Sequence, residues 1–572
     1  MLKFEQGQVE FSTAEISNRI RLRTDSHRWC SKHVPYATLW PNFSHRCAPS
    51  DSEAIKLDGE NAVLYANRAA AYIAQRQYLD AAKDAQRRDQ AVEIDPSYSK
   101  AWARLAKSTF ELRAWQPSIN AWKKALETLP SADLTAQQEQ LKQQYEEGLK
   151  QAETELQKNE SKTMEQHNLR SVPADDQRPW IRALKMEDVL TSNAVLNTSA
   201  WVIMNAYKDF SAGVRYMKEI KKTDTGIHGN MNDIRRPVAV IQALQLIING
   251  LLRDDRVFHM DSEDWLDKLQ LQVQFEVSAN EGWVEGGPET VKEEAVKRLK
   301  EKGWKSVRGA LGATIRAWFL RAYFAHRSRS SLSLALQYYN DVLDVLDWGA
   351  RTWHDVPTAD RGVIFQKTYI RAIRRLKMDA YLGALKEAED DSEYNVEDLM
   401  ELANQIVDET TKNAPKEGDN DEGPLDKGAW YSFFVYPVAD AHATLGAIFM
   451  QQGLSAKQAG DKAEAENMLA AASKFYKKAA EMYPPDDENF ALYLKVAFEA
   501  EYHLGKPLSD TLPLCKRIRD SLPGILKIWE MSPSDKLTRH IPDIDRFEER
   551  AYTGILEKKY TLETPSSEVP LN

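Results

Sequence analysis

Large and small apolar residues recur in a fixed order between residues 61 and 130, and that order predicts pairs of packed helices. In the second of two such stretches the large and small positions are Trp102, Leu105, Ala106, Ala125 and a closing Pro130. Two antiparallel helices approach closely only where a small residue faces a large one. The preceding stretch has the same order, in Tyr65, Ala69, Tyr72, Ala81 and Pro96.

The two stretches are related by a repeat. Pro96 and Pro130 lie 34 residues apart, which is the period of the tetratricopeptide repeat, a helix-turn-helix unit. The first stretch holds three residues more than this period, Arg88, Asp89 and Gln90. Either the second helix of that repeat bulges there, or these residues are an artefact of the gene model.

The runs 61–72 (NAVLYANRAAAY) and 94–105 (IDPSYSKAWARL) resemble the second and third repeats of the co-chaperone tetratricopeptide domains. These domains occur in chaperone-organising proteins, immunophilins, a protein phosphatase and the small glutamine-rich proteins. The resemblance implies binding of the acidic C-terminal tails of cytosolic heat-shock chaperones through a clamp that holds two carboxylates. Carried over by position, the clamp residues present are Asn67, Lys100 and Arg104.

The chemistry of these side chains agrees with that role. Lys100 and Arg104 are four residues apart and therefore share one face of a helix, the one expected to line the groove of a repeat array. Two cations and an amide can hold a C-terminal carboxylate by charge-assisted hydrogen bonds. The alternative is that both cations simply belong to a solvated helix face.

The first repeat departs from the family pattern. Gly7 and Phe11 fit its first helix, but Gln8 stands where the family has Asn and Phe4 where it has Lys. Residues 12–52 lack helical periodicity, so residues 1–53 are expected to be irregular, as a retained intron or mis-joined exon or as a disordered insertion. A zinc site could be drawn from the histidines and cysteines of this segment, but its spacing matches no familiar pattern.

Further helical segments follow the repeats. Thr135 and Gln138 match a capping box ahead of a polar helix of the kind that closes a repeat array. Thr290 and Glu293 match a second capping box, at the start of a helix that we expect to end near Gly303. The expected division is repeats at 54–130, a capping helix at 131–160, a linker at 161–177, a helical region at 178–410, a flexible acidic loop at 411–428, a degenerate repeat region at 429–528 and a C-terminal tail at 529–572. Only the last residues, 557–572, are expected to be frayed.

The repeat order returns in the region 429–528. Leu445, Gly446 and Phe449 fit the first helix of a repeat, and Tyr476, Ala479 and Pro484 fit the second. About fourteen residues more than the period separate the two halves, so we expect elongated helices. No run of alternating β-branched residues of useful length appears in the sequence, so we expect little β-sheet. The predicted fold class is all-α, made of tetratricopeptide-like hairpins in an α-solenoid, with two helical regions joined by linkers.

Composition and charge narrow the function. The chain is 28% charged and 42% apolar with a net charge of −10, which disfavours nucleic acid as a partner. Its three cysteines argue for a reducing compartment. No secretory signal begins the chain, and the longest apolar run, 238–252, is interrupted by polar residues and too short for a membrane span. We expect a cytoplasmic protein that is not an integral membrane protein.

Catalytic motifs are absent from the sequence. It has no phosphate-binding loop, nucleophile elbow or His-Glu-x-x-His. His259 lies near Asp254, Asp255 and Asp261, but acidic residues beside a histidine are common on surfaces. A run between Tyr369 and Lys377 mixes basic and apolar residues, which predicts an amphipathic helix with its arginines on the polar face.

These observations predict a non-enzymatic adaptor without a cofactor or metal. In the first hypothesis it is a co-chaperone or targeting adaptor that grips a chaperone tail with Asn67, Lys100 and Arg104, with Gln8 as a weak fourth contact. In the second it is a scaffold whose groove binds internal peptide segments. An enzyme in the C-terminal region, the third hypothesis, is supported by no motif.

Overall fold

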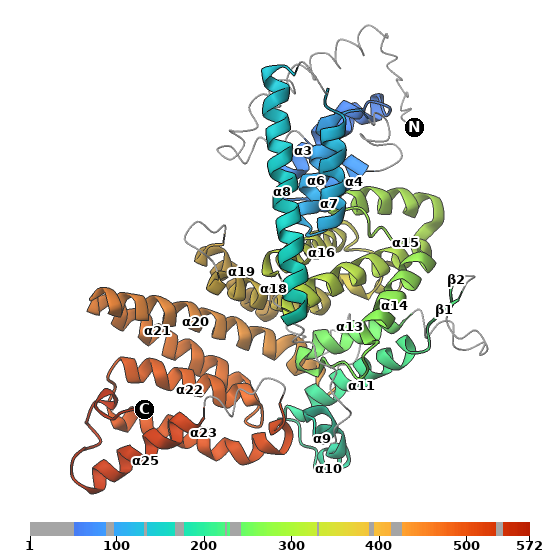
Figure 1. The fold of residues 1–572 in the computed structure, drawn as a ribbon. Helices are drawn as coiled ribbons and strands as arrows, with labels where there is room; N and C mark the ends of the chain where they lie inside the picture. The colour runs from blue at the N-terminus through green and yellow to red at the C-terminus, as the bar shows by residue number, and fades with distance from the viewer. Residues whose placement is uncertain are drawn as a thin grey trace, which may run out of the picture. The chain divides into compact units, whose positions relative to one another are not determined.

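Helices make up most of the described part of the chain (Figure 1). The computed structural model describes residues 48, 51–86, 97–130, 134–165, 177–223, 226–228, 242–328, 331–387, 394–412, 426–532 and 541–571. The chain forms two compact units. The first comprises residues 1–168 and 283–301, and the second comprises residues 169–282 and 302–572.

The first unit is a stack of helical hairpins. Residues 51–57 are helical and are followed by α3 (Ala62–Ala74), α4 (Tyr78–Gln86), α6 (Ser99–Glu111), α7 (Trp115–Glu127) and α8 (Ala136–Glu165). Each helix from α3 to α8 packs against the next one in this order, and α3 also packs against α6. Neighbouring hairpins therefore share contacts through their first helices, as in a repeat array.

Small residues lie where the sequence predicted close helix contacts. Ala69, Ala81, Ala106 and Ala125 have no exposed surface. In α8 the backbone itself reaches α7, because a Cβ on Gly148 would lie 2.5 Å from the ring of Trp122. The predicted packing of small against large residues is confirmed.

The predicted cap of α8 is also confirmed. The backbone amide of Gln138 donates to Thr135 Oγ1 at 3.3 Å, and the Gln138 side chain accepts from the Thr135 amide at 2.9 Å. This reciprocal pair satisfies two amides that otherwise lack partners in the first turn of a helix. The helix ends at Glu165, a few residues beyond the predicted boundary.

The second unit is longer and contains one small hairpin of strands among its helices. Its elements are α9 (Pro179–Lys185), α10 (Glu187–Ser192), α11 (Ala200–Met217), β1 (Lys221–Thr223), β2 (Gly226–His228), α13 (Ala243–Arg253), η2 (Asp255–Val257), α14 (Trp265–Ala279), α16 (Leu332–Thr352), α17 (Thr358–Arg361), η3 (Val363–Phe365), α18 (Lys367–Glu387), α19 (Val396–Lys412), the π-helical η4 (Tyr431–Val435), α20 (Tyr436–Ala459), α21 (Lys462–Met482), α22 (Glu488–His503), α23 (Leu508–Trp529), α25 (Pro542–Leu556) and η5 (Ser566–Glu568). Strands β1 and β2 pair in antiparallel register.

One long helix belongs to both units. Helix α15 (Pro288–Arg327) contains the non-helical residue Gly303, with φ 72° and ψ −179°. Its residues up to 301 belong to the first unit and the remainder to the second. The prediction that the helix breaks at Gly303 is confirmed, but a second helical stretch follows at once. The predicted start at Thr290 is wrong, because the helix begins at Pro288.

The C-terminal helices form a second array of hairpins. From α18 to α23 each helix packs against its successor (Figure 1). A Cβ on Gly446 in α20 would lie 2.9 Å from the ring of Tyr476 in α21, so the predicted small and large positions face one another. Helices α20 and α21 span 24 and 21 residues. The expectation of elongated repeat helices is therefore confirmed.

The prediction that the arginines of α18 lie on the polar face of an amphipathic helix is wrong. Arg371 and Arg374 are 1% and 8% exposed. Arg371 Nη1 donates to the Phe433 carbonyl at 2.7 Å, and Arg374 Nη2 lies 2.6 Å from Asp347 Oδ1. Because α16, α19 and α20 all pack against α18, its basic side chains are buried and paired with acceptors from neighbouring helices.

The C-terminal segment is packed, so the expectation of fraying between residues 557 and 571 is wrong. The backbone amides of Leu508 and Ser509 donate to the carbonyls of Thr564 and Leu562 at 3.0 and 2.9 Å. Val569 has no exposed surface. These contacts attach the segment to the first turn of α23.

One helical stretch, Tyr431–Ala459, is long and apolar enough to cross a membrane by length and composition, and 67% of its most apolar window is buried within the fold. A buried core helix passes the same test. Several other predictions lie outside the described residues: Gln8, the histidines and cysteines between residues 30 and 47, the three extra residues 88–90, and most of the acidic loop.

His442 in α20 provides a pH-dependent prediction. Both of its ring nitrogens are buried without a hydrogen-bond partner among the described residues, and burial, followed by the charge of Lys478, lowers its pKa to about 4. The unfolded side chain has a pKa of 6.5, so His442 takes up a proton on unfolding. Its contribution to stability is therefore lost as the pH falls from about 6.5 towards 4.

We expect His442→Leu to reduce the loss of stability between pH 7 and pH 5 by on the order of 1–2 kcal/mol. Urea unfolding monitored by circular dichroism at pH 7 and pH 5 measures the difference. The exposed His354→Leu serves as the control. Equal acid sensitivity in the wild-type protein and His442→Leu would contradict the prediction.

Candidate peptide-binding groove

Two cations predicted to bind a ligand lie in the first turns of α6. Lys100 is exposed and Arg104 is half-buried. Their spacing of four residues places both on one side of the helix. The structure thus separates the two residues by environment, because Lys100 reaches solvent while Arg104 is largely enclosed.

The guanidinium of Arg104 interacts with Tyr98, yet one of its nitrogens has no acceptor among the described residues. Its Nη1 is buried and has no hydrogen-bond partner among the described residues. Burial lowers the pKa of Arg104, while the neighbouring Tyr98, Tyr145 and Asp51 side chains act in the opposite direction. An arginine stays charged even so, and a buried unpaired donor costs free energy. The arrangement favours an anionic or carbonyl acceptor beside Nη1.

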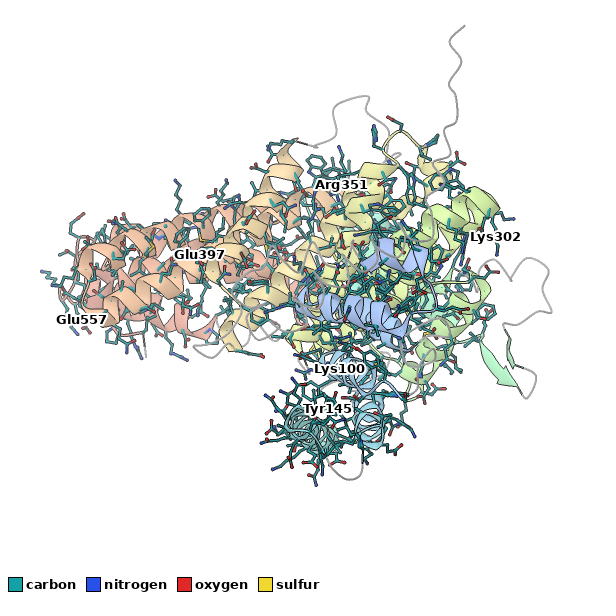
Figure 2. The ribbon with its side chains drawn as sticks, turned by 90° about the horizontal axis from the view of Figure 1, so that it is seen from above. Lys100, Tyr145, Lys302, Arg351, Glu397 and Glu557 are labelled. Carbon is teal, nitrogen blue, oxygen red and sulfur yellow. The ribbon has the colours of Figure 1, made fainter. Side chains whose placement is uncertain are left out.

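Aromatic residues from two elements surround this cation. Tyr98 directly precedes α6 and Tyr145 belongs to α8, where its ring lies 5.7 Å from that of Trp122. Figure 2 labels Lys100 and Tyr145 on their adjoining helices. Burial raises the pKa of Tyr145. Sequence reasoning did not select either tyrosine, because apolar spacing places them simply as packing residues.

Asn67, the third predicted residue, lies half-buried in α3, which packs against α6. The neighbouring Arg68 fixes this helix from within. Its Nε and Nη2 donate to the two carboxylate oxygens of Asp84 in α4 at 2.6 and 2.7 Å, and its Nη1 donates to Ser52 Oγ at 3.0 Å. This bidentate pair ties three helices together. Convergence of Asn67 with Lys100 and Arg104 on one ligand remains a prediction.

A buried acid lies close to the same cations. Asp51 is 1% exposed, and burial raises its pKa to about 7, although the charges of Arg68 and Arg104 oppose the rise. The carboxyl group is therefore partly protonated at neutral pH. It compensates the charge of Arg104 less fully than an ionised partner would.

No family model matches the chain. Among curated proteins, it is 48% identical over 54 residues to the small glutamine-rich tetratricopeptide repeat-containing protein 2 of Saccharomyces cerevisiae, a match that covers 9% of this chain and 15% of that protein. This relative is named for its tetratricopeptide repeats, and the match supports the presence of such repeats in this chain. A second relative is the heat-shock protein cognate (HSC) co-chaperone sgt12 of Aspergillus fumigatus, 41% identical over 61 residues, or 11% of this chain and 17% of that protein.

Each of these two matches spans about a sixth of the length of the relative concerned. Among solved structures, yeast Tom70 aligns with 95% of this chain and 99% of its own at 11% identity and a TM-score of 0.26. Naa15/Naa10 bound to HypK-THB aligns with 92% of this chain and 80% of its own at 14% identity and a TM-score of 0.17. Scores this low bear on neither the fold nor the function.

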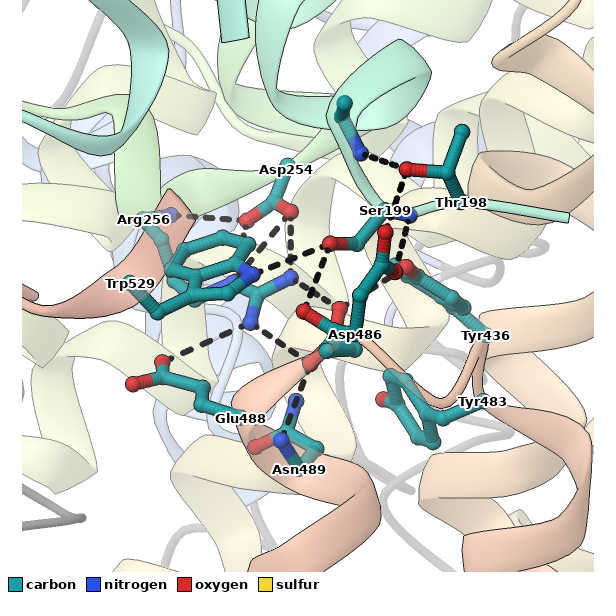
Figure 3. Close-up of polar contacts among 12 residues, drawn as sticks. Thr198, Ser199, Asp254, Arg256, Tyr436, Tyr483, Asp486, Glu488, Asn489 and Trp529 are labelled. Carbon is teal, nitrogen blue, oxygen red and sulfur yellow. Dashed lines mark hydrogen bonds and ion pairs between the residues drawn. The ribbon is translucent and has the colours of Figure 1, made fainter. Parts of the chain in front are cut away.

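The second unit holds a buried polar network (Figure 3). Arg256 donates from Nη2 to Asp254 at 2.7 Å and to Asp487 at 2.9 Å, and its guanidinium lies 3.9 Å from the ring centroid of Trp529. Asp487 also accepts from the Tyr436 hydroxyl at 2.8 Å. It caps α22 as well, because its side chain accepts from the backbone amide of Asn489.

The acid that precedes this cap extends the network to another helix. Asp486 accepts from the backbone amide of Ser199 at 2.7 Å, and Trp529 Nε1 donates to Ser199 Oγ at 2.9 Å. Burial raises the pKa of Asp486, although its bonds with Ser199 and Thr198 oppose the rise. The donors and acceptors satisfy one another, so the network is suited to hold helices together rather than to bind a substrate.

His259, the other candidate, belongs to an aromatic stack. Its ring lies 4.6 Å from that of Trp180, and its Nδ1 bonds the Val257 carbonyl at 2.8 Å. Burial lowers its pKa. A shallow hollow of about 340 Å³ beside it is lined partly by an ion pair between Lys218 and Asp261. No group of three or more histidine, cysteine or acidic residues able to hold a metal occurs in the described ranges.

Proposed function

We propose that this protein is a cytoplasmic adaptor whose first unit binds the acidic C-terminal tail of a heat-shock chaperone. One observation supports the proposal above others, namely the buried Nη1 of Arg104, which lacks a partner among the described residues. Lys100, one helical turn earlier, adds an exposed cation. A C-terminal peptide offers two carboxylates, from its last residue and from the terminus itself, which match two cations.

The similarity of a short stretch of this chain to a named co-chaperone supports the same proposal. One relative is named as a heat-shock protein cognate co-chaperone. The family supplies further clamp contacts from its first repeat, where this chain has Phe4 and Gln8. We therefore expect weaker binding than a complete clamp gives, because each charge-assisted contact contributes roughly 1.5–3 kcal/mol.

A scaffold that binds internal peptide segments is the second candidate. The enclosure of Arg104 by Tyr98 and Tyr145 favours it, because a backbone carbonyl next to an apolar side chain would also satisfy a guanidinium flanked by aromatic rings. No enzymatic activity is assigned in either proposal. The second unit would then hold a client or a further protein in both cases.

The test of the proposal is a titration of a fluorescently labelled peptide that ends in Glu-Glu-Val-Asp. We expect a saturable rise in anisotropy that is reversed by unlabelled peptide and weakened by added salt, because exposed charge pairs are screened. Saturable binding of an internal Pro- and aromatic-rich peptide, together with no response to the acidic tail, would instead favour the scaffold.

A further inference from the structure

The chain passes through the first unit twice. It leaves this unit at residue 168, returns at residue 283 and leaves again at residue 301. The returning segment, Trp283–Glu301, contains the start of α15 and is not a tetratricopeptide helix by sequence. Its contacts with the repeats are specific, and they involve one buried acid.

Asp80, in the first turn of α4, caps the start of α15. Asp80 is 1% exposed. Its Oδ1 accepts from the backbone amides of Gly287 at 3.1 Å and Thr290 at 3.0 Å, and its Oδ2 accepts from the amide of Glu289 at 3.0 Å. The first amides of a helix have no partner within the helix, and a carboxylate is the acceptor that the positive end of the helix favours.

The returning helix cannot cap itself. The residue before Pro288 is glycine, which has no side chain to accept a bond from the first turn. The capping acceptor therefore comes from α4, a helix more than two hundred residues earlier in the chain. This dependence distinguishes the contact from ordinary surface packing, because undocking would leave three amides of the first turn without their acceptor.

The absence of a side chain at Gly287 also permits the contact. A Cβ built there would lie 2.4 Å from Asp80 Oδ2 and 2.7 Å from the Asp80 backbone nitrogen. Neither distance is compatible with normal packing. Gly287 and Asp80 thus form a matched pair in which the backbone of the returning segment lies directly against the hairpin.

The next turns of the helix are amphipathic. Val291 and Ala295 have no exposed surface, and their spacing of four residues places them on one face. Outside that face, Glu293 acts electrostatically on Lys56 and Arg68, and Glu289 acts on Tyr72. The acidic side chains of the returning helix therefore face basic and aromatic residues of the first two hairpins.

We infer that the end of the α3–α4 hairpin is a docking site for the start of a helix, and that residues 283–301 of this chain are its resident ligand. The ligand requires a residue without a side chain at the position before its first helical residue, followed by a short apolar face. The left-handed φ of Gly303 ends the docked portion, so this glycine is the hinge at which the segment joins the rest of α15.

The docking site is separate from the proposed peptide groove. Among the described residues, the charged and phenolic groups that act on Arg104 are Tyr98, Tyr145 and Asp51, and none of them belongs to the returning segment. The docked helix and a peptide held by Arg104 therefore engage different side chains of the first unit. Loss of one interaction leaves the other measurable, so the two proposals can fail independently.

The test uses hydrogen exchange of the full chain with Gly287→Ala. We expect amides 289–301 to exchange at least about tenfold faster, while amides of α6 and α7 keep their wild-type rates. The matched control is Gly59→Ala, because a Cβ there would be 3.6 Å from its nearest neighbour, the carbonyl oxygen of Ile55, which is an ordinary contact. Unchanged exchange of amides 289–301 in Gly287→Ala would overturn the inference.

A binding experiment completes the test. A synthetic peptide of residues 283–302, titrated by anisotropy, should bind Gly287→Ala, in which the site is vacated, at least about tenfold more tightly than the wild-type protein, in which it is occupied. Adding Asp80→Asn to Gly287→Ala should weaken that binding at least about tenfold. Failure of the peptide to bind Gly287→Ala after release of the segment would also overturn the inference.

Discussion

Lys100→Ala combined with Arg104→Ala is expected to weaken binding of the Glu-Glu-Val-Asp peptide by at least about 100-fold. Both cations contribute charge-assisted hydrogen bonds of roughly 1.5–3 kcal/mol each, and every 1.4 kcal/mol changes an affinity about tenfold. Arg104 should account for the larger part, because its Nη1 is buried without a partner among the described residues while Lys100 is exposed to water. Fluorescence anisotropy measures the affinity of each single variant and of the pair.

The control for this experiment is Lys124→Ala. Lys124 lies on α7, is 55% exposed and pairs with Glu127 at 2.7 Å, so its removal changes the net charge by one without touching α6. We expect little change in affinity. Comparable losses in Lys124→Ala and Arg104→Ala would show that the peptide is attracted by net charge alone, which would contradict the clamp.

Arg256→Met is expected to destabilise the second unit by about 3–5 kcal/mol. Removing the guanidinium leaves Asp254, Asp487 and Glu488 buried without the positive charge that they surround, and breaking a buried ion pair from one side has this cost. The acids lie 2.7, 2.9 and 3.4 Å from the guanidinium nitrogens. The methionine fills much of the volume of the arginine side chain, so the loss reports the missing guanidinium, with its ion pairs and its contact with Trp529, more than a cavity.

Urea unfolding followed by tryptophan fluorescence, with hydrogen exchange of α22, measures this effect. The matched control is Arg517→Met, whose partner Glu481 lies 3.7 Å away and whose side chain is 42% exposed. Surface pairs of this kind contribute little, so its unfolding midpoint should stay close to that of the wild-type protein. An Arg256→Met midpoint equal to that of Arg517→Met would show that the network does not hold the unit together.

The repeat fold could be predicted because its signals are local. Ala106, Gly446 and the pair of Thr135 with Gln138 each act within a single hairpin or helix turn, and the structure places each of them as its local pattern predicted. Periodicity and capping act between residues close in sequence, so one chain is sufficient to detect them. The same holds for Lys100 and Arg104, whose shared helix face follows from their spacing.

The contacts that could not be predicted join residues far apart in the sequence. Asp80 caps a helix that begins at Pro288, and the sequence favoured Thr290 as its cap because a capping box is a local pattern. Arg256 meets Asp487 from a helix 231 residues further on. Burial of the α18 arginines likewise depends on acids of other helices. Periodicity within one helix cannot distinguish a solvated charged face from one covered by acidic neighbours.

The burial of Arg104 also shows what the sequence could not decide about the groove. As a helical position it is equivalent to Lys100, yet Tyr98, Tyr145 and Asp51 enclose it. This enclosure makes the guanidinium more dependent on a ligand acceptor than a solvated arginine would be. It also limits the ligand to one that brings an acceptor oxygen close to the aromatic rings.

The most direct test of the central claim compares two forms of one peptide. The labelled Glu-Glu-Val-Asp peptide is titrated against the full chain with either a free C-terminal carboxylate or a C-terminal amide. The amide removes one negative charge and no side chain, so a clamp that holds the terminal carboxylate should bind it at least about tenfold more weakly. Equal affinity for the two forms would contradict the clamp and favour a groove that binds internal peptide segments.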